Sequence, residues 1–330
     1  MAEKIRWGII GTGNIARQFA RGLAVVPDAE LVAVGSRTQA SADAFAELFS
    51  VPHRHATYEA LAQDPQVDAV YVATPHNLHC ANSLLCLEAG KAVLCEKPFT
   101  INAAEAAQVI DRAREKGLFL MEAMWTRFLP ALVRLRELLA TGTIGPVHML
   151  AADLGFRAQF DPKSRLFDPD LGGGALLDLG VYPVSLASMV FGTPACLTGL
   201  AYLGATGVDE QAGVVLGYDA GRLAVIHMSI RAATPGEAIL MGSAGQIRVH
   251  SPIYMPSGLT LSLAGQTDQV LELPFTGNGY NYEAVEVMNC MRAGKTESAV
   301  MPLDETLSIM QTMDQIRAQW GLKYPMEIEQ

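Results

Sequence analysis

Three side chains of this chain, those of Lys97, Asp178 and Tyr182, could move a proton to or from an alcohol. Lys97 lies in "VLCEKPFT", whereas Asp178 and Tyr182 lie four residues apart in "GGGALLDLGVYPVS". Oxidation of an alcohol requires a base for the hydroxyl proton, and reduction requires an acid. A phenol with a pKa of about 10 is a poor base at neutral pH, but an adjacent ammonium group lowers that pKa. These residues therefore predict acid–base chemistry at a carbinol or carbonyl carbon.

The same residues also have ordinary structural interpretations. Asp178 and Tyr182 could be the cap and a partly buried core residue of a helix softened by glycines, and Lys97 could pair with Glu96 on the surface. Pro183 disfavours helical geometry at the residue before it, so a shared helical face for Asp178 and Tyr182 stays open. The sequence also leaves open whether the peptide bond before Pro98 is cis.

A glycine pattern near the start of the chain predicts a dinucleotide site. The stretch "GIIGTGNIA" follows a strand-like segment and begins a helix-like one. In such turns the first glycine allows the tight turn, the second lets the backbone approach a pyrophosphate, and a small third residue packs helix against strand. The helix N-terminus would bind the phosphates. The predicted cofactor residues of this turn are Gly11, Thr12, Gly13, Asn14 and Ile15.

The end of the second predicted strand indicates which cofactor is bound. NAD-specific folds usually carry an acid there, but this chain reads "VGSRT". Ser36, Arg37 and Thr38 can instead donate hydrogen bonds and a positive charge to a 2′-phosphate. We expect NADP(H) to be preferred, with NAD(H) as the alternative. The same sequence would also occur if Arg37 were a solvated arginine beside two loop hydroxyls with no role in cofactor binding.

The order of the predicted elements divides the chain into two parts. In residues 1–123 short apolar strands alternate with helices, which is typical of a parallel sheet covered on both faces. The strands are expected at 4–10, 29–37, 67–75, 91–98 and 118–123, and the helices at 14–25, 40–50, 77–89 and 103–117, with Asn102 as an N-cap.

Strands dominate the second part, residues 124–330, after one helix at 131–142. They are expected at 147–156, 196–204, 212–218, 222–231, 237–243, 245–250, 259–265 and 269–275, and the last two helices at 282–292 and 303–320. The predicted fold class is α/β, with an N-terminal Rossmann (doubly wound parallel sheet) domain. A C-terminal α+β domain follows, with a large open, mostly antiparallel sheet.

Composition narrows the class of protein. The chain has 330 residues, half of them hydrophobic, and a formal net charge of −10, which argues against nucleic-acid binding. The segment "MAEKIRWGIIG" lacks the order of a signal peptide, and we counted no apolar run of membrane-spanning length, so a cytoplasmic protein without a membrane partner is expected. The five cysteines are expected to be free buried thiols. The pairs His53/His55 and His76/His79 lack further ligands at metal-binding spacing, so no metal site is predicted.

Four motifs together resemble a known family. "GIIGTGNIA", "VATPHNLH", "CEKPFT" and "GGGALLDLGVY" occur in the order and spacing of the Gfo/Idh/MocA oxidoreductases. The runs "MEAMWTRFLP" and "GFRAQFDPKSRLFDPDLGGGALLDLGVYP" look like one branch, the dimeric dihydrodiol dehydrogenases and NADP-dependent D-xylose dehydrogenases. The resemblance implies hydride transfer between a nicotinamide and a carbon of a sugar or polyol. It also implies a homodimer or homotetramer formed through the C-terminal sheet.

The resemblance also assigns residues. The family's catalytic lysine falls on Lys97 and the acid of its "DxGxH" pattern on Asp178, whereas the histidine of that pattern is replaced by Tyr182, as in the dihydrodiol dehydrogenase branch. Further cofactor-binding residues are Thr74, Pro75, His76, Asn77, His79, Glu96, Lys97, Trp125 and Arg127. The expected substrate-binding residues are Trp125, Phe156, Arg157, Phe160, Asp178 and Tyr182, where the aromatic rings suit the apolar face of a sugar or an aromatic diol. The glycines are expected to let the backbone approach cofactor or substrate.

Overall fold

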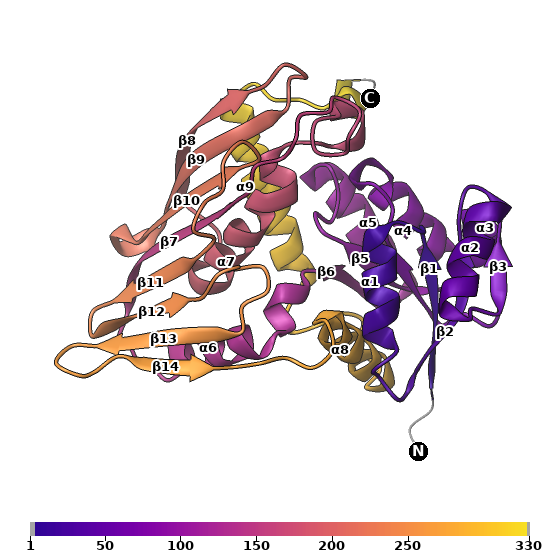
Figure 1. Cartoon of the computed structure of the whole chain (residues 1–330), viewed down its shortest axis with the longest axis horizontal. Coiled ribbons are helices and arrows are strands. Elements are labelled where there is room, and N and C mark those ends of the chain that lie inside the picture. Colours follow the sequence, from indigo (N-terminus) through magenta and orange to yellow (C-terminus); the bar gives the residue numbers. More distant parts are fainter. Residues whose placement is uncertain (1–3, 329–330) are drawn as a thin grey trace. The chain divides into compact units, whose positions relative to one another are not determined.

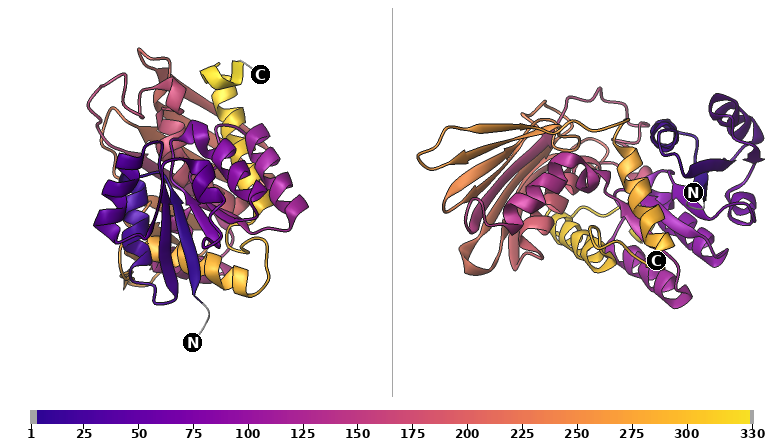
Figure 2. Two further views of the ribbon diagram at one scale, coloured as in Figure 1. Left: turned by 90° about the vertical axis from the view of Figure 1, so that its right-hand side faces the viewer. Right: turned by 90° about the horizontal axis from the view of Figure 1, so that it is seen from below.

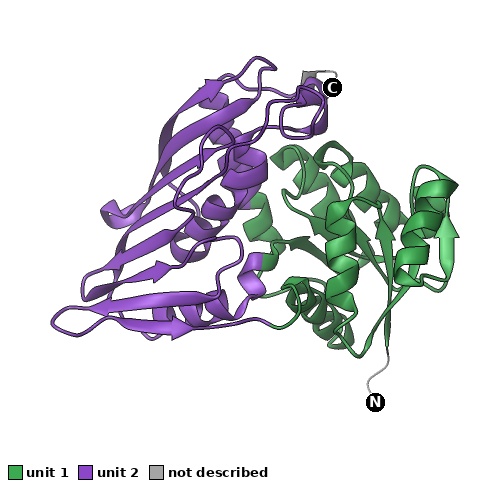
Figure 3. Cartoon of the chain, viewed as in Figure 1, with its two compact units in different colours: residues 1–125, 276–307 green, residues 126–275, 308–330 purple. Residues whose placement is uncertain are grey.

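The computed structural model describes residues 4–328, so the first three residues of the segment read for a signal peptide lie outside the described part. The chain forms two compact units (Figure 3). Unit 1 contains residues up to Trp125 together with Thr276–Leu307, and unit 2 contains Thr126–Phe275 together with the residues from Ser308 onward. The division therefore differs from the predicted boundary after residue 123, because a late segment of the chain packs with the first part.

The sheet of unit 1 is a parallel Rossmann sheet. Its six strands have the order β3-β2-β1-β4-β5-β6, and every neighbouring pair is parallel (Figure 1). The predicted fold class is confirmed for this unit, although the sequence did not predict the short edge strand β3. The strands are β1 (Ile5–Ile10), β2 (Ala29–Gly35), β3 (His53–His55), β4 (Ala69–Val72), β5 (Ala92–Glu96) and β6 (Leu120–Ala123).

Helices connect and cover these strands. They are α1 (Asn14–Leu23), α2 (Gln39–Phe49), α3 (Tyr58–Ala62), α4 (His79–Glu88), α5 (Ala103–Lys116) and α8 (Tyr280–Arg292). The predicted cap of α5 is confirmed, because Asn102 Oδ1 accepts a hydrogen bond of 2.9 Å from the Glu105 N–H. In the core the ring of Phe19 stacks on Tyr71 with centroids 3.7 Å apart, and Trp7 meets Phe19 edge-on.

Close packing against α1 explains why the late segment belongs to unit 1. A Cβ on Gly22 would lie 2.9 Å from the Cβ of Tyr280, so this glycine lets α8 approach α1 directly. Asn278 Nδ2 also donates a hydrogen bond of 2.8 Å to the Gln18 carbonyl. Both contacts join residues about 260 positions apart. Local periodicity in the sequence does not indicate that a distant segment packs against α1.

Unit 2 is built on one eight-stranded sheet with the order β14-β13-β12-β11-β7-β10-β9-β8. All neighbouring strands are antiparallel except β7 and β10, which run parallel with Ala152 opposite Ile226, so the predicted mostly antiparallel sheet is confirmed. The strands are β7 (Val147–Gly155), β8 (Cys196–Leu203), β9 (Asp209–Gly217), β10 (Leu223–Ser229), β11 (Ala238–Gly242), β12 (Gly245–Val249), β13 (Gly258–Leu263) and β14 (Gln269–Glu272).

The helices of unit 2 gather on one face of this sheet (Figure 2). Helix α6 (Pro130–Ala140) contacts β13, and α7 (Val181–Phe191) contacts β7 and β10. The later part of α9 (Leu303–Gln319) and the short α10 (Pro325–Ile328) complete the unit. Along β8 every second side chain points away from the core, and Leu200 is 85% exposed. The opposite face of the sheet therefore presents apolar side chains.

One apolar segment bears on the expected absence of a membrane-spanning run. Among the described residues, Pro169–Phe191 is long and apolar enough to cross a membrane by length and composition. Its most apolar window is 83% buried inside the structure, which is typical of a core helix of a water-soluble fold. Asp178 interrupts this apolar run, so the sequence shows no uninterrupted apolar stretch of that length.

Candidate functional site

The turn after β1 fits a dinucleotide phosphate. Gly11 has a φ of 105°, and a Cβ on it would lie 2.6 Å from the Ala73 carbonyl oxygen, so only glycine fits there. Gly13 is the N-cap of α1; no side chain of the described residues caps the helix there, and no described atom lies within 4 Å of the place of its missing Cβ. Thr12, Asn14 and Ile15 are at least partly exposed. The open helix N-terminus thus has both the space and the N–H groups that a pyrophosphate requires.

The end of β2 brings the three predicted adenosine-side residues together. The N–H of Ser36 donates to the His55 carbonyl at 3.0 Å, and the Ser36 side chain is buried. The hydroxyl of Thr38 caps α2, because it accepts from the Ser41 N–H at 3.3 Å and contacts Ser41 Oγ at 2.9 Å. Arg37 is exposed. Burial raises the pKa of Tyr58, and the nearby charge of Arg37 partly offsets this rise. Arg37 is therefore the cation of this loop, whereas the Thr38 hydroxyl already serves the helix.

His79 links two loops instead of facing a ligand. Its side chain is fully buried, with Nε2 2.9 Å from the Thr74 carbonyl oxygen and Nδ1 2.8 Å from the Pro98 carbonyl oxygen. Burial lowers its pKa. The hydroxyl of Thr74 in turn accepts a hydrogen bond from Asn82 Nδ2. The expected cofactor contact of His79 is corrected here, because a fully buried ring with both nitrogens facing main-chain carbonyls has no surface for a cofactor.

The neighbours of His79 are more open. Pro75 is exposed, and His76 lies in a 3₁₀ turn (His76–Leu78) with its ring edge-on to His79. Asn77 Oδ1 is buried and has no hydrogen-bond partner among the described residues. A buried acceptor without a donor costs free energy, so Asn77 fits a hydrogen bond donated by a cofactor.

Several hydrogen bonds fix the loop that carries Lys97. Glu96 ends β5, where its carboxylate accepts hydrogen bonds from the Tyr71 hydroxyl and from the Lys97 N–H. The Lys97–Pro98 peptide bond is cis, which answers the question left by the sequence. The Pro98 carbonyl faces His79, and the next N–H, that of Phe99, donates to Glu122 Oε1 at 3.2 Å. The main chain is thus held on both sides of Lys97, whose side chain is partly exposed.

A second carboxyl lies beneath this loop, and the sequence analysis missed it. Glu283 of α8 is fully buried, and neither carboxyl oxygen has a hydrogen-bond partner among the described residues. Burial, and then the charge of Glu96, raise the pKa of Glu283 well above its usual range. Burial therefore favours the neutral form of the Glu283 carboxyl group. Only the return of α8 to unit 1 brings it near Glu96.

Trp125 and Arg127 lie in different units, and both are buried. Trp125 stacks on Tyr280 within unit 1, with ring centroids 4.5 Å apart. In unit 2 the guanidinium of Arg127, 3% exposed, donates to the Ser185 hydroxyl at 3.0 Å and to the Ser185 carbonyl at 2.7 Å. Arg127 therefore helps to hold α7 in place, and its contact with the nicotinamide or the substrate stays a prediction.

Asp178 and Tyr182 lie on one continuous helical segment. Residues Leu176–Gly180 form a π-helix that continues directly into α7, with the Val181 N–H bonded to the Leu176 carbonyl. Pro183 is the third residue of α7, in the first turn, where a missing N–H is tolerated. Residues four apart lie near the same face in both helix types. The question left by the sequence is answered: the proline does not separate the acid from the phenol.

Arg165 holds Asp178, and the sequence analysis did not single it out. Its two terminal nitrogens lie 2.7 and 3.2 Å from the two carboxylate oxygens of Asp178. Asp178 is buried, whereas the Arg165 side chain is 57% exposed. A two-pronged ion pair fixes the orientation of the carboxylate. The exposed end of this pair is the part that a ligand could reach.

The three glycines before Asp178 serve the chain itself. A Cβ on Gly173 would lie about 3 Å from three main-chain carbonyl oxygens. Gly174 has a φ of 117°, and its Cβ would lie 2.2 Å from Asp209 Oδ1. Asp209 Oδ2 accepts a hydrogen bond of 2.7 Å from the Leu176 N–H at the start of the π-helix. The expectation that these glycines make room for a ligand is thus corrected at Gly173 and Gly174, where packing within unit 2 requires them.

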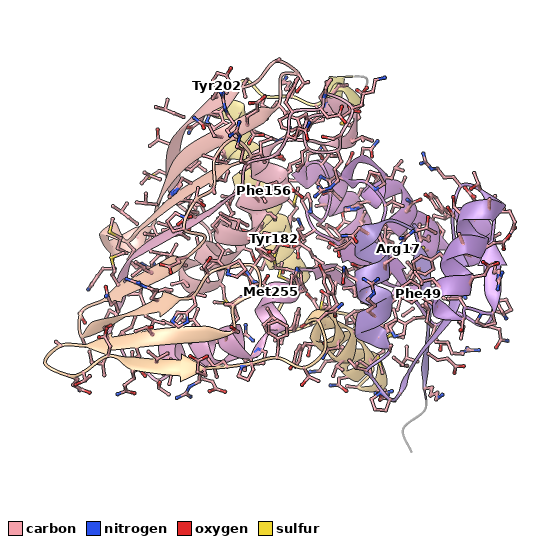
Figure 4. The ribbon with its side chains drawn as sticks, in the orientation of Figure 1. Arg17, Phe49, Phe156, Tyr182, Tyr202 and Met255 are labelled. Atoms are coloured by element: carbon pink, nitrogen blue, oxygen red, sulfur yellow. The ribbon has the colours of Figure 1, made fainter. Side chains whose placement is uncertain are left out.

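The predicted aromatic wall is exposed. Phe156 and Phe160 are 40% and 52% exposed, Arg157 is exposed, and Phe160 meets Phe167 edge-on. The ring of Tyr182 lies beside Tyr254, with centroids 5.9 Å apart. Figure 4 labels Phe156 and Tyr182, both in unit 2. Large exposed rings of this kind can contact a ligand, whereas the fully buried ring of His79 cannot.

Comparison with known proteins gives the family. Residues 5–124 match the Gfo/Idh/MocA oxidoreductase family with its NAD-binding Rossmann fold, and residues 132–248 match a C-terminal domain of the same family. The trans-1,2-dihydrobenzene-1,2-diol dehydrogenase of Mus musculus is 38% identical over 335 residues, covering 98% of this chain and 99% of that protein; the Homo sapiens enzyme is 37% identical, with the same coverage.

Solved structures agree with this result. A 3-ketoreductase from Actinomadura kijaniata in complex with NADP has a TM-score of 0.84 and 27% identity, covering 96% of this chain and 98% of its own. An aldose-aldose oxidoreductase from Caulobacter crescentus has a TM-score of 0.88 and 24% identity, covering 97% and 99% of the two chains, and shares the fold. The chain belongs to the Gfo/Idh/MocA oxidoreductase family, as the four sequence motifs indicated.

Proposed function

We propose that this protein is an NADP(H)-dependent oxidoreductase that transfers a hydride between the nicotinamide and a carbinol or carbonyl carbon of a sugar or cyclic diol. The observation that carries the proposal is the similarity, over the full length of both chains, to trans-1,2-dihydrobenzene-1,2-diol dehydrogenases. The bound nicotinamide would accept or supply the hydride, and the chain's own residues would bind the substrate and move the proton.

Tyr182 is the proposed proton donor and acceptor. Its place at the first turn of α7 is fixed by the buried Arg127–Ser185 contacts. The positive charge of Lys97 is proposed to favour the phenolate, because an ammonium group lowers the pKa of a nearby phenol. Asp178, held by Arg165, is proposed to orient a substrate hydroxyl or the phenol. An ionised carboxylate accepts hydrogen bonds and so suits a substrate rich in hydroxyl groups.

The substrate class is proposed from the exposed rings and the relatives. Phe156 and Phe160 offer apolar faces, which suit the C–H face of a sugar ring or the ring of a diol. Two types of activity follow: a D-xylose or other aldose 1-dehydrogenase, and a trans-dihydrodiol dehydrogenase. A non-catalytic dinucleotide-binding regulator or redox sensor is the competing function.

A substrate screen tests the proposal. Purified protein is incubated with NADP⁺ and aldoses, inositols or trans-dihydrodiols, and with NADPH and dicarbonyls, while the NADPH absorbance is followed. We expect turnover with at least one aldose or dihydrodiol and slower turnover with NAD⁺. Tight NADPH binding without turnover of any compound would instead support the regulator.

Arg37 is the residue proposed to select NADP(H). Replacing Arg37 by alanine should raise the Kd for NADPH by about ten- to a hundredfold, because a charge-assisted hydrogen bond contributes about 1.5–3 kcal/mol. The Kd for NADH should stay unchanged, since NADH lacks the 2′-phosphate. Both constants are measured by fluorescence titration. Arg54→Ala is the matched control, because Arg54 is a partly exposed arginine of the same unit that pairs with Asp43. Equal losses for the two cofactors would exclude this role.

We also propose that the open face of the unit 2 sheet forms a homodimer or homotetramer. Leu200, Tyr202, Leu223 and Val225 are exposed on β8 and β10, which are separated by one strand. Apolar side chains gathered on one sheet face favour association with a second copy. Leu200→Glu should shift the protein toward monomer in sedimentation or light scattering.

A further inference from the structure

A cluster of two histidines and one aspartate lies at the edge of the unit 1 sheet. The Nδ1 atom of His53 lies 2.5 Å from Asp64 Oδ2, and the Nε2 atom of His55 lies 3.0 Å from the same oxygen. All three donor atoms lie within 4.8 Å of one another. From the sequence alone the two histidines were not predicted to bind a metal, because no carboxylate accompanies them at ligand spacing. The fold supplies that carboxylate from a residue nine positions further along the chain.

Local structure aims these three groups at one point. His53 and His55 are alternate residues of β3, so their side chains project from the same face of that strand. Asp64 follows α3, and its carboxylate is oriented because Oδ1 accepts a hydrogen bond of 2.8 Å from the Gln66 N–H. Oδ2 is thereby left to face both imidazoles.

The charges around the cluster suit a dication. Asp64 is almost fully buried, and its carboxylate oxygens contact His53, His55 and the Gln66 N–H. The ammonium of Lys91 donates to the main-chain carbonyls of Asp64 and Val67. The guanidinium of Arg54, which lies between the histidines in sequence, faces Asp43 and Glu47. These cations are thus held by other oxygen atoms.

We propose that His53, His55 and Asp64 bind one first-row transition-metal dication, such as Zn²⁺, in place of the two histidine–aspartate hydrogen bonds. Two imidazoles and one carboxylate are borderline ligands suited to Zn²⁺, Co²⁺ and Ni²⁺. The His53 and His55 side chains are 39% and 21% exposed, so water can complete the coordination. The imidazole nitrogens bind a metal through their unprotonated lone pairs, so protons are released to the solvent on binding.

The site is connected to the proposed NADP(H) loop. His55 lies opposite Gly35 in the sheet, and its carbonyl accepts the hydrogen bond from the Ser36 N–H, next to Arg37. A metal that fixes the His55 ring would therefore act on the loop proposed to bind the 2′-phosphate. This consequence rests on the proposed cofactor preference, whereas metal binding itself does not.

Calorimetric titration with Zn²⁺ tests the site in the full chain after treatment with a chelator. We expect one Zn²⁺ per chain, and His55→Ala or His53→Ala should weaken binding by at least about tenfold, because even groups that only support metal ligands contribute that much. His148→Ala is the control, since His148 is an exposed histidine of unit 2. Circular dichroism establishes that the variants fold, and the exposed His53 is the safer position to replace.

Titration with Co²⁺ identifies the ligands by absorption. Visible d–d bands without a thiolate charge-transfer band are expected for two imidazoles and a carboxylate. A thiolate band would indicate binding at a cysteine, such as the exposed Cys196, and would overturn the proposal. The absence of saturable Zn²⁺ binding up to about 1 mM, or equal affinity in both histidine variants and the unchanged protein, would also overturn it.

Discussion

Tyr182→Phe should lower kcat by about 10²- to 10⁴-fold, the usual contribution of a positioned acid–base group. The variant keeps the ring that lies beside Tyr254 and loses only the hydroxyl. The Kd for NADPH should stay within about twofold, because a group that acts in the transition state contributes little to ground-state binding. Steady-state rates with the best substrate from the screen and fluorescence titration with NADPH measure the two effects.

Two further variants make this result specific. Tyr218→Phe removes another mostly buried phenol of unit 2, one whose pKa burial raises to about 12, and it should leave kcat nearly unchanged. Lys97→Met should move the basic limb of the kcat profile to higher pH, because in the proposed mechanism the ammonium of Lys97 favours the ionised phenol. A near-normal kcat in Tyr182→Phe would remove this tyrosine from the mechanism.

Asp209→Asn should stabilise unit 2 relative to the unchanged protein at pH 8. At pH 5 this stabilisation should be smaller. Burial raises the pKa of Asp209 from 3.8 to about 7. The folded chain therefore keeps a proton that the unfolded chain loses between about pH 4 and pH 7, so the free energy of unfolding falls as pH rises. The loss amounts to about 4 kcal/mol for a shift of this size. Asparagine does not titrate, and its carbonyl oxygen can still accept the hydrogen bond from the Leu176 N–H.

Thermal unfolding followed by circular dichroism between pH 5 and pH 8 measures this effect as the difference in Tm between variant and unchanged protein. The difference should grow as pH rises toward 7 and level off above it. Asp219→Asn provides the control, because Asp219 is an exposed aspartate of the same unit and should give a constant difference. A Tm difference for Asp209→Asn that does not change with pH would show that Asp209 is ionised in the folded protein.

Local signals predicted much of unit 1. The turn around Gly11 and Gly13, the alternation of strands and helices, and the cap at Asn102 all depend on residues adjacent in sequence. The strand β3 escaped prediction because it has three residues, two of them histidine, and no apolar pattern. The NAD-type acid was correctly found to be missing after β2, but the use of the Thr38 hydroxyl as a helix cap was not foreseen.

The rest depends on contacts between distant residues. Asp178 and Tyr182 could be picked from their chemistry, but the partner of Asp178, Arg165, becomes evident only when the loop folds back. His79 has a residue type that suits a ligand site, yet burial commits its ring to two main-chain carbonyls. Sequence letters do not reveal burial at polar residues, so candidates of this kind were overpredicted. Glu283 and Asp209 were missed for the converse reason, because their environment rather than their type makes them unusual.

The division of the chain between the units governs the order in which the protein can fold as it is made. Unit 1 needs Thr276–Leu307 to cover α1, and the ribosome completes this segment only after all of residues 126–275 have been synthesised. One side of α1 therefore stays uncovered while the eight strands of unit 2 are synthesised. A gene fragment that stops after residue 123 would encode the whole parallel sheet and still lack α8, the helix that packs against α1.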